Sequence, residues 1–225
     1  MSESAQTSAD EISVRVLLVD DHDLFRTGLR NLLEERGVQI AGEAAQGDEA
    51  VRLVRELAPD VVVMDLHMPG ISGIEAIRQI AGFAPLTRVL VLTISDQDED
   101  VLHAILAGAC GYLLKDASVD ELIRGIEAAA VGESLVSPAI AGKVLQQVRA
   151  TAISPDAADA VRAELSQREL DVLKLISSGK DNAMIAAELH ISPKTVKNHI
   201  SNILMKLQIE NRIQAAVYAV RSGIV

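Results

Sequence analysis

The stretch that decides the fold is Val-Val-Val-Met-Asp-Leu-His-Met-Pro-Gly at residues 61–70. Its four apolar residues end directly in Asp65, which is typical of a buried strand in a parallel sheet. Similar apolar runs alternate with segments of helical period from residue 14 to about residue 131, and this pattern predicts an α/β doubly wound parallel sheet, flavodoxin-like and five-stranded. The predicted strands are 14–19, 38–41, 61–64, 89–92 and 111–114, and the predicted helices are 24–35, 48–57, 73–80, 99–107 and 119–130.

Three carboxylates follow two of these strands. Asp20 and Asp21 come after the first strand, and Asp65 comes after the third. Ligands of such sheets bind at the carboxyl ends of the strands, so we expect these side chains to converge there. Crowded carboxylates need a cation, and oxygen ligands with room for water suit Mg²⁺.

A hydroxyl and an ammonium belong to the same predicted edge. Thr93 ends the fourth strand and Lys115 follows the fifth. Together with a metal, they suit phosphoryl transfer to a carboxylate, for which Asp65 is the best nucleophile candidate. The plain alternative is that each acidic residue caps a strand and Lys115 is solvated. That alternative is improbable for five such residues at the ends of four strands.

These motifs resemble the CheY-like receiver family over about residues 13 to 131. The resemblance implies that Asp65 accepts a phosphoryl group. It also implies that Asp21 and Asp65 ligate Mg²⁺ with the backbone carbonyl of His67, and that Asp20 helps through water. The motifs that carry it are Val-Asp-Asp at 19–21, Met-Asp-Leu-His-Met-Pro-Gly at 64–70, Thr93 and Tyr-Leu-Leu-Lys at 112–115. The implied switch and phosphoryl-contacting residues are Thr93, Tyr112 and Lys115.

Two features of the receiver stay open in the sequence. Tyr112 lies three residues before Lys115, so an alternating strand points them to opposite faces, and Tyr112 can turn inward or outward. Ile94 stands where many receivers have a small residue after the threonine, so the lifetime of the phosphoryl group is not fixed by the resemblance.

Two other functions compete with a phosphorylated receiver. A phosphatase of the haloacid dehalogenase type also forms an aspartyl-phosphate, but it requires a second Asp two residues after the nucleophile, where this chain has His67. A pseudo-receiver would bind DNA without phosphate, which the retained acidic set argues against. We therefore expect no enzyme activity beyond slow self-dephosphorylation. No Walker loop or GxGxxG motif indicates nucleotide binding.

Charge divides the chain into two parts. The net charge is −11, but residues 1–150 hold 12 Lys and Arg against 24 Asp and Glu, whereas residues 151–225 hold 9 against 8. This contrast predicts two domains of different electrostatic character.

Cys110 is the single cysteine, which excludes an intrachain disulfide and fits a reducing cytosol. No apolar run is long enough to span a bilayer, so we expect a cytoplasmic protein without membrane contact.

The domain boundaries follow from these shifts in composition. We expect a disordered N-terminus at 1–12, a receiver at 13–135, a linker at 136–163 with a helical part at 137–148, and a helix-turn-helix domain at 164–225.

Capping signals mark the helices of the second domain. Ser166 and Glu169 form a capping box, Asp181 can cap a short helix, and Ser192-Pro193 opens a long helix to about residue 205. A brief turn at His190-Ile191 separates the helix capped by Asp181 from the helix that Ser192 opens, so these two helices form a candidate helix-turn-helix. Asn211 can cap a final helix.

The helix after Ser192 has a polar, partly basic side opposite an apolar side. Its Lys side chains can contact phosphate, and Asn198 can pair with an adenine edge, although an ordinary amphipathic surface helix has the same pattern. The second domain resembles the LuxR-type helix-turn-helix of the NarL/FixJ regulators through Leu-Ser-Gln-Arg-Glu at 165–169 and Thr-Val-Lys-Asn-His at 195–199. The DNA-contacting residues, expected from the helix or from the resemblance, are Lys194, Thr195, Lys197, Asn198, His199 and Ser201.

The final helix repeats apolar residues at helical spacing. In the NarL/FixJ relatives the corresponding helix pairs subunits on DNA, so the resemblance implies dimerisation through Ile213, Val217 and Val220. The expected function is that of a response regulator and transcription factor. A sensor histidine kinase would phosphorylate it on Asp65, and the phosphorylated homodimer would bind double-stranded DNA with paired half-sites.

Overall fold

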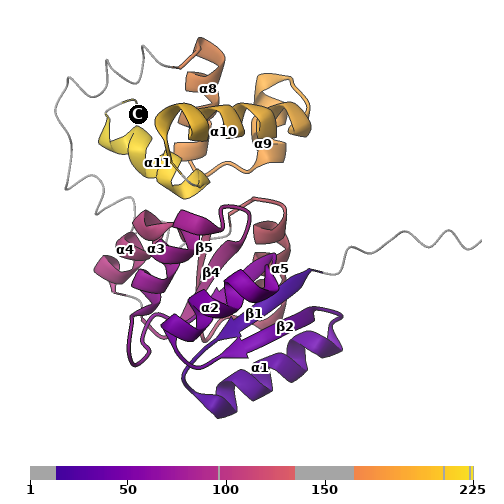
Figure 1. Ribbon diagram of the computed structural model, residues 1–225. Coiled ribbons are helices and arrows are strands. Elements are labelled where there is room, and N and C mark those ends of the chain that lie inside the picture. The colour runs from indigo at the N-terminus through magenta and orange to yellow at the C-terminus, as the bar shows by residue number, and fades with distance from the viewer. Residues whose placement is uncertain (1–13, 96, 135–164, 210, 223, 225) are drawn as a thin grey trace, which may run out of the picture.

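The computed structural model describes residues 14–95, 97–134, 165–209, 211–222 and 224. They form two units, a sheet covered by helices and a helical domain, which lie against each other (Figure 1). The expected disordered segment at 1–12, the linker and its helix at 137–148 lie outside the described residues. No helix in the described ranges is long and apolar enough to cross a membrane.

The first unit is built on a five-stranded sheet in the order β2-β1-β3-β4-β5, and every neighbouring pair is parallel. This confirms the predicted α/β doubly wound fold. The strands are β1 (Arg15–Val19), β2 (Gln39–Ala44), β3 (Val61–Met64), β4 (Arg88–Thr93) and β5 (Gly111–Leu114). The strand order reverses between β1 and β3, and such a switch point opens a crevice at the carboxyl ends of the strands.

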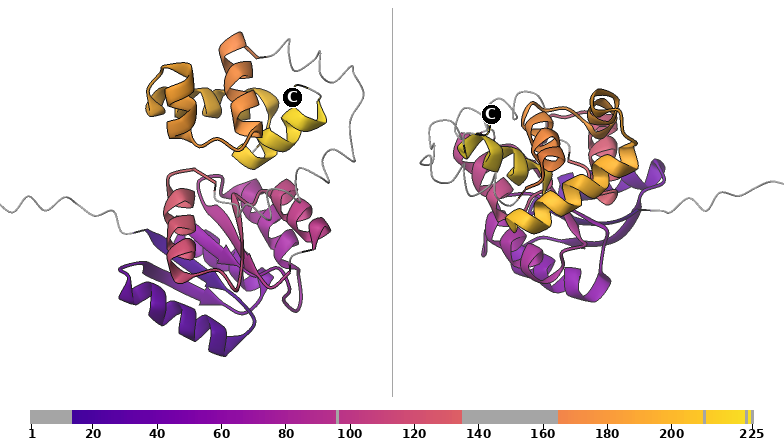
Figure 2. Two further views of the ribbon diagram at one scale, coloured as in Figure 1. Left: turned by 180° about the vertical axis from the view of Figure 1, so that it is seen from behind. Right: turned by 90° about the horizontal axis from the view of Figure 1, so that it is seen from above.

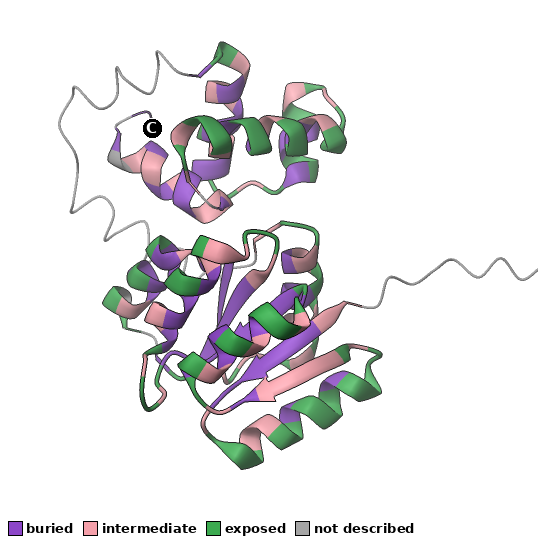
Figure 3. Cartoon of the chain, in the orientation of Figure 1, coloured by how far each residue is buried: buried purple, intermediate pink, exposed green. Residues whose placement is uncertain are grey.

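Alternating side chains divide the core of this unit into two layers. Leu17 and Val62 belong to the cluster under α2, α3 and α4, whereas Leu18 and Val63 belong to the cluster under α1 and α5. The strands are therefore buried on both faces, and the outer sides of the helices are exposed (Figure 3). The helices are α1 (Asp23–Glu35), α2 (Gly47–Leu57), α3 (Gly73–Phe83), α4 (Asp98–Ala107) and α5 (Val119–Ala130).

The second unit consists of four described helices around its own apolar cluster. The predicted caps are confirmed: the side chains of Ser166, Asp181, Ser192 and Asn211 each accept a hydrogen bond from a backbone N–H in the first turn. His190 adopts a left-handed conformation at φ 54° and ends the first helix of the helix-turn-helix. The helices are α8 (Gln167–Ser177), α9 (Asn182–Leu189), α10 (Pro193–Leu207) and α11 (Arg212–Arg221).

One buried carboxylate ties α8 to α10. Glu169 completes the capping box with Ser166, and it accepts a hydrogen bond of 2.7 Å from Lys206 Nζ. Burial alone would raise the pKa of Glu169, but the hydrogen bonds from Lys206 and Ser166 outweigh it and lower the pKa. The ionised carboxylate therefore stabilises the packing of α10, the helix expected to contact DNA.

Candidate functional site

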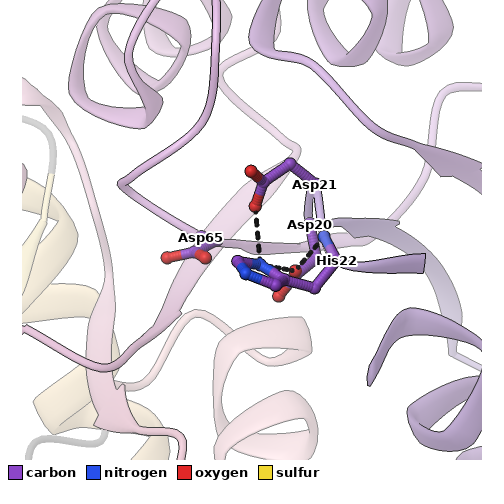
Figure 4. A group of neighbouring side chains, drawn as sticks. All are labelled: Asp20, Asp21, His22 and Asp65. Atoms are coloured by element: carbon purple, nitrogen blue, oxygen red, sulfur yellow. Dashed lines mark hydrogen bonds and ion pairs between the residues drawn. The ribbon is translucent and has the colours of Figure 1, made fainter. Parts of the chain in front are cut away.

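The predicted acidic residues converge at the carboxyl edge of the sheet. Asp20 and Asp21 follow β1, and Asp65 follows β3, where its N–H donates to the Val19 carbonyl at 2.9 Å. Asp20 and Asp65 are buried, and Asp21 is partly exposed. Figure 4 shows their carboxylates facing a common space, which His22 also enters. This edge is the switch point between β1 and β3.

Lys115 joins two of these carboxylates. Its Nζ lies 2.6 Å from Asp20 Oδ2 and 2.7 Å from Asp65 Oδ2, and 4.6 Å from the centre of the Phe25 ring. Burial favours the neutral amine, but the hydrogen bonds with Asp20 and Asp65 outweigh it and raise the pKa of Lys115. The ammonium thus partly offsets the charge of two buried carboxylates, as the sequence suggested.

The donor atoms of the acidic site lie close enough together to bind one cation. Asp20, Asp21, His22 and Asp65 each offer one donor atom, and these atoms lie within 4.8 Å of one another. Asp21 Oδ1 is shielded from solvent and accepts no hydrogen bond among the described residues, and its close polar neighbour is His22 Nδ1 at 2.8 Å. A shielded carboxylate oxygen that accepts no hydrogen bond is costly, and a cation would supply the missing interaction.

His67 and Asp65 share the β3–α3 loop. The backbone N–H of Leu66 donates to Asp65 Oδ1 at 2.7 Å, and the His67 N–H lies 3.4 Å from the same oxygen. The His67 imidazole is exposed, and its Nε2 lies 3.5 Å from Asp100 Oδ2. This agrees with an interpretation in which the His67 backbone, and not its side chain, faces the acidic site.

The expected switch residues lie on neighbouring strands. Thr93 and Tyr112 are both fully buried. The Tyr112 hydroxyl donates to the Ser95 carbonyl at 2.8 Å, so the side chain is turned inward, one of the two orientations that the sequence allowed. The Ser95 hydroxyl in turn donates to Asp100 in the first turn of α4. The β4–α4 loop therefore connects Thr93, Tyr112 and α4.

Two residues that support the acidic loops were not found from the sequence. Arg26 Nη1 donates to the Asp20 carbonyl at 2.6 Å, and its Nε lies 3.2 Å from Glu43 Oε2, so it anchors the β1–α1 loop. A Cβ atom added at Gly73 would lie 2.2 Å from the Asp65 carbonyl oxygen. Only Gly allows this approach of α3 to the Asp65 loop. Both contacts cross from a helix to the loop before it, at spacings that no helical or strand period signals.

The long helix of the second unit presents its predicted polar side to solvent. Lys194, Lys197, Asn198 and Ser201 are exposed on α10, while Val196, Ile200 and Ile203 are buried in the domain core. Thr195 and His199 are half-buried. The predicted core stripe and polar stripe are thus both present.

The last helix, α11, packs on the receiver next to α4 (Figures 1 and 2). Val217 is buried in the receiver's apolar cluster, and Ile213 and Val220 pack against it. Two buried amides add directional contacts: Asn211 Nδ2 donates to the Ala109 carbonyl and Gln214 Nε2 to the Ile105 carbonyl, each at 3.0 Å. The residues expected to pair subunits are therefore covered by the receiver in this structure.

Glu133 forms a second, polar contact between the units. It lies just after α5, and its Oε1 accepts a hydrogen bond of 3.1 Å from Asn182 Nδ2. The same oxygen is 3.5 Å from Lys197 Nζ on α10. Asn182 also accepts a hydrogen bond of 2.6 Å from Arg212, and burial lowers the pKa of that guanidinium. One predicted DNA contact thus lies beside an acidic receiver residue.

The fold and the site define a receiver joined to a helix-turn-helix DNA-binding domain. Residues 16–127 match the response regulator receiver domain family, and residues 163–219 match the luxR family of bacterial regulatory proteins. The chain belongs to the NarL/LuxR family of two-component response regulators.

The similarity to known proteins extends over nearly the whole chain. The transcriptional regulatory protein LiaR of Bacillus subtilis is 45% identical over 213 residues, which cover 94% of this chain and 99% of LiaR. The nitrate/nitrite response regulator protein NarL of Escherichia coli is 36% identical, over 90% of this chain and 93% of NarL. The crystal structure of the response regulator ChrA of a heme-sensing two-component system is 35% identical, with a TM-score of 0.52 over 95% of this chain and 99% of ChrA.

We predict that Gly73→Ala destabilises the receiver by about 1–3 kcal/mol, the usual cost of overpacking, because the new methyl group displaces the Asp65 backbone. Gly82→Ala is the matched control in the same helix, since no atom lies within 4 Å of a Cβ there. The measurement is urea unfolding of both full-length variants. Equal stability of the two variants would show that the Asp65 loop accommodates the methyl group.

Proposed function

We propose that this protein is a transcription factor controlled by phosphorylation of Asp65 by a sensor histidine kinase. The observation that carries the proposal is the position of Lys115, whose ammonium lies within 2.7 Å of both Asp20 and Asp65 at the switch point of the sheet. This arrangement supports a nucleophilic carboxylate with a fixed cation beside it. The family to which the chain belongs supports the same role.

In the proposed transfer, an Asp65 carboxylate oxygen attacks the phosphorus atom of a phosphohistidine. The bond between phosphorus and the histidine nitrogen breaks, and its electron pair leaves with the imidazole. Lys115 can then exchange its contact with Asp65 for a phosphoryl oxygen, and the Thr93 hydroxyl can donate to another. The chain accepts the group and does not turn over a substrate of its own.

The carboxylates of Asp20, Asp21 and Asp65 and the backbone carbonyl of His67 are proposed to hold Mg²⁺. The shielded Asp21 Oδ1, which accepts no hydrogen bond among the described residues, supports this assignment. Bound there, Mg²⁺ offsets the charge of the nucleophile and of the incoming phosphate. Arg26 and Gly73 contribute by fixing the two loops that carry these ligands.

For DNA, we propose that α10 enters the major groove. The exposed Lys194 and Lys197 would contact phosphates with help from Thr195, and Asn198, His199 and Ser201 would face bases or backbone. The exposure of this side of α10 supports the proposal, as does the helix-turn-helix geometry from α9 into α10. Two such domains on paired half-sites would compensate for few contacts each.

Control would act through α11. The receiver covers Ile213, Val217 and Val220, so these residues cannot pair two subunits while the contact persists. A phosphoryl group adds roughly two negative charges beside the loop that joins Thr93 to α4. We propose that the resulting shift of α4 weakens its contact with α11, and that the freed helix forms a homodimer on DNA.

We predict that Asp65→Asn abolishes phosphorylation while the fold remains, because the amide keeps the size of the carboxylate and removes its nucleophilic charge. Labelling with acetyl phosphate and Mg²⁺ measures this. Asp60→Asn, at the other end of β3, is the control and should label normally. Undiminished labelling of Asp65→Asn would contradict the assignment, absence of labelling in the natural protein would favour a pseudo-receiver, and turnover of phosphate esters would favour a phosphatase.

We predict that Lys197→Ala weakens DNA binding and reduces the salt slope of the affinity by about one, as expected for the loss of one phosphate contact. Asn198→Ala should instead relax base preference. The measurement is DNA binding across a range of salt, with sites obtained by selection from random sequences. Lys174→Ala on α8 is the control for a lysine exposed elsewhere in the domain. An unchanged salt slope together with unchanged selectivity would mean that α10 does not read DNA.

We predict that Gln214→Ala raises the DNA affinity of the unphosphorylated protein about fivefold, which corresponds to losing roughly 1 kcal/mol of one net hydrogen bond to α4. Gln79→Ala, which removes an exposed amide on α3, should change nothing. Light scattering with and without beryllofluoride measures the accompanying change in mass. Lower affinity of Gln214→Ala, or a mass that ignores beryllofluoride, would contradict control through α11.

A further inference from the structure

The imidazole of His22 lies at the solvent-exposed rim of the acidic site and has no role in the proposed function. His22 follows Asp20 and Asp21 at the N-cap position of α1. Its Nδ1 lies 2.8 Å from Asp21 Oδ1 and 3.4 Å from Asp20 Oδ1 (Figure 4). The ring thus turns back over the two carboxylates that precede it.

These distances are those of neighbouring ligands around one cation. With bonds of about 2.1 Å in an octahedral site, adjacent ligand atoms lie about 3 Å apart. Asp21 Oδ1 accepts no hydrogen bond, and its 2.8 Å contact with Nδ1 is an attractive ion pair only when the imidazole carries a proton there. When the lone pair of Nδ1 faces the oxygen instead, the two atoms repel each other. A cation shared by the two atoms would satisfy both.

We propose that His22 supplies a nitrogen ligand to the cation of this receiver, so that the site binds a transition-metal dication more tightly than Mg²⁺. The inference rests on the proposed function, which places a dication among these carboxylates. Mg²⁺ takes oxygen ligands and keeps several waters, whereas imidazole suits the later first-row metals. The carboxylates can bind either cation, whereas the imidazole favours the transition-metal dication.

The second imidazole of this edge does not compete for the role. His67 Nε2 lies 3.5 Å from Asp100 Oδ2, on the side of α4. The group of donor atoms that the described residues bring within 4.8 Å contains His22 and not His67. The nitrogen ligand is therefore assigned to one residue, which a single substitution can test.

The first experiment compares two cations on the full chain after removal of metal by a chelator. Co²⁺ binding is followed by visible absorption, and Mg²⁺ binding by competition with Co²⁺. In His22→Phe we expect the Co²⁺ affinity to fall at least about tenfold, the lower end of the effect of changing even an outer-shell partner, while the Mg²⁺ affinity changes less than about twofold. His103→Phe, an exposed histidine on α4, is the matched control and should leave both affinities unchanged.

The second experiment tests directly whether a nitrogen atom is bound to the metal. Pulsed electron paramagnetic resonance of the Mn²⁺-loaded natural protein should show a ¹⁴N coupling that His22→Phe lacks. Absence of the coupling from the natural protein overturns the inference, and so does an equal change of both affinities in His22→Phe. If Mg²⁺ still binds in either case, the proposed receiver function stands. If neither cation binds to the natural protein, the proposed Mg²⁺ site fails together with the inference.

Discussion

The structure of the receiver depends on one ion-paired group, the Lys115 ammonium between the carboxylates of Asp20 and Asp65. Two buried like charges repel each other and are costly to desolvate, and one cation next to both offsets much of that cost. Lys115 follows β5 and reaches past β4 to make these contacts, so it requires β1, β3, β4 and β5 to be in register. A phosphoryl oxygen on Asp65 would also attract the Lys115 ammonium. Phosphorylation would therefore change the ion pairs that stabilise this edge of the sheet.

Helix α4 is contacted at both ends by parts of the chain that are far apart in sequence. At its first turn, Asp100 accepts from the hydroxyl of Ser95, whose carbonyl accepts from Tyr112. At its last turn, the Ile105 carbonyl accepts from Gln214 of α11. A displacement of the β4–α4 loop therefore acts on a rigid element that also carries the contact with the DNA-binding domain. This continuity is geometric, and its coupling energy is what the Gln214 and beryllofluoride measurements determine.

Local signals predicted much of this fold from the sequence. The strand Val61–Met64 and the helix Val119–Ala130 have the predicted bounds, and the four caps of the second domain lie at the predicted residues, because periodicity and capping act within a few residues. The predicted parallel order of the strands also indicated that five residues of the phosphoryl site would meet at the carboxyl edge of the sheet. These are Asp20, Asp21, Asp65, Thr93 and Lys115. The roles of Arg26 and Gly73, and the packing of Val217 on the receiver, were not predictable in this way. Val217 contacts a segment that is distant in sequence, and the contacts of Arg26 and Gly73 depend on the path of the loop before each helix, so no short pattern encodes them.

In the proposed mechanism, the apolar side of α11 would let the charge of one phosphoryl group control dimerisation. Burial of a side chain such as Val217 stabilises the closed state by about 1.5–3 kcal/mol, and each amide hydrogen bond to the receiver adds roughly 1 kcal/mol. The lost freedom of the side chains held in this contact opposes these contributions. The net preference is then of the same order as the roughly 5.5 kcal/mol that carries a two-state equilibrium from one state almost wholly to the other. Because the same residues would be buried again in a dimer, opening exposes them only until a partner arrives, and DNA with two half-sites raises the local concentration of that partner.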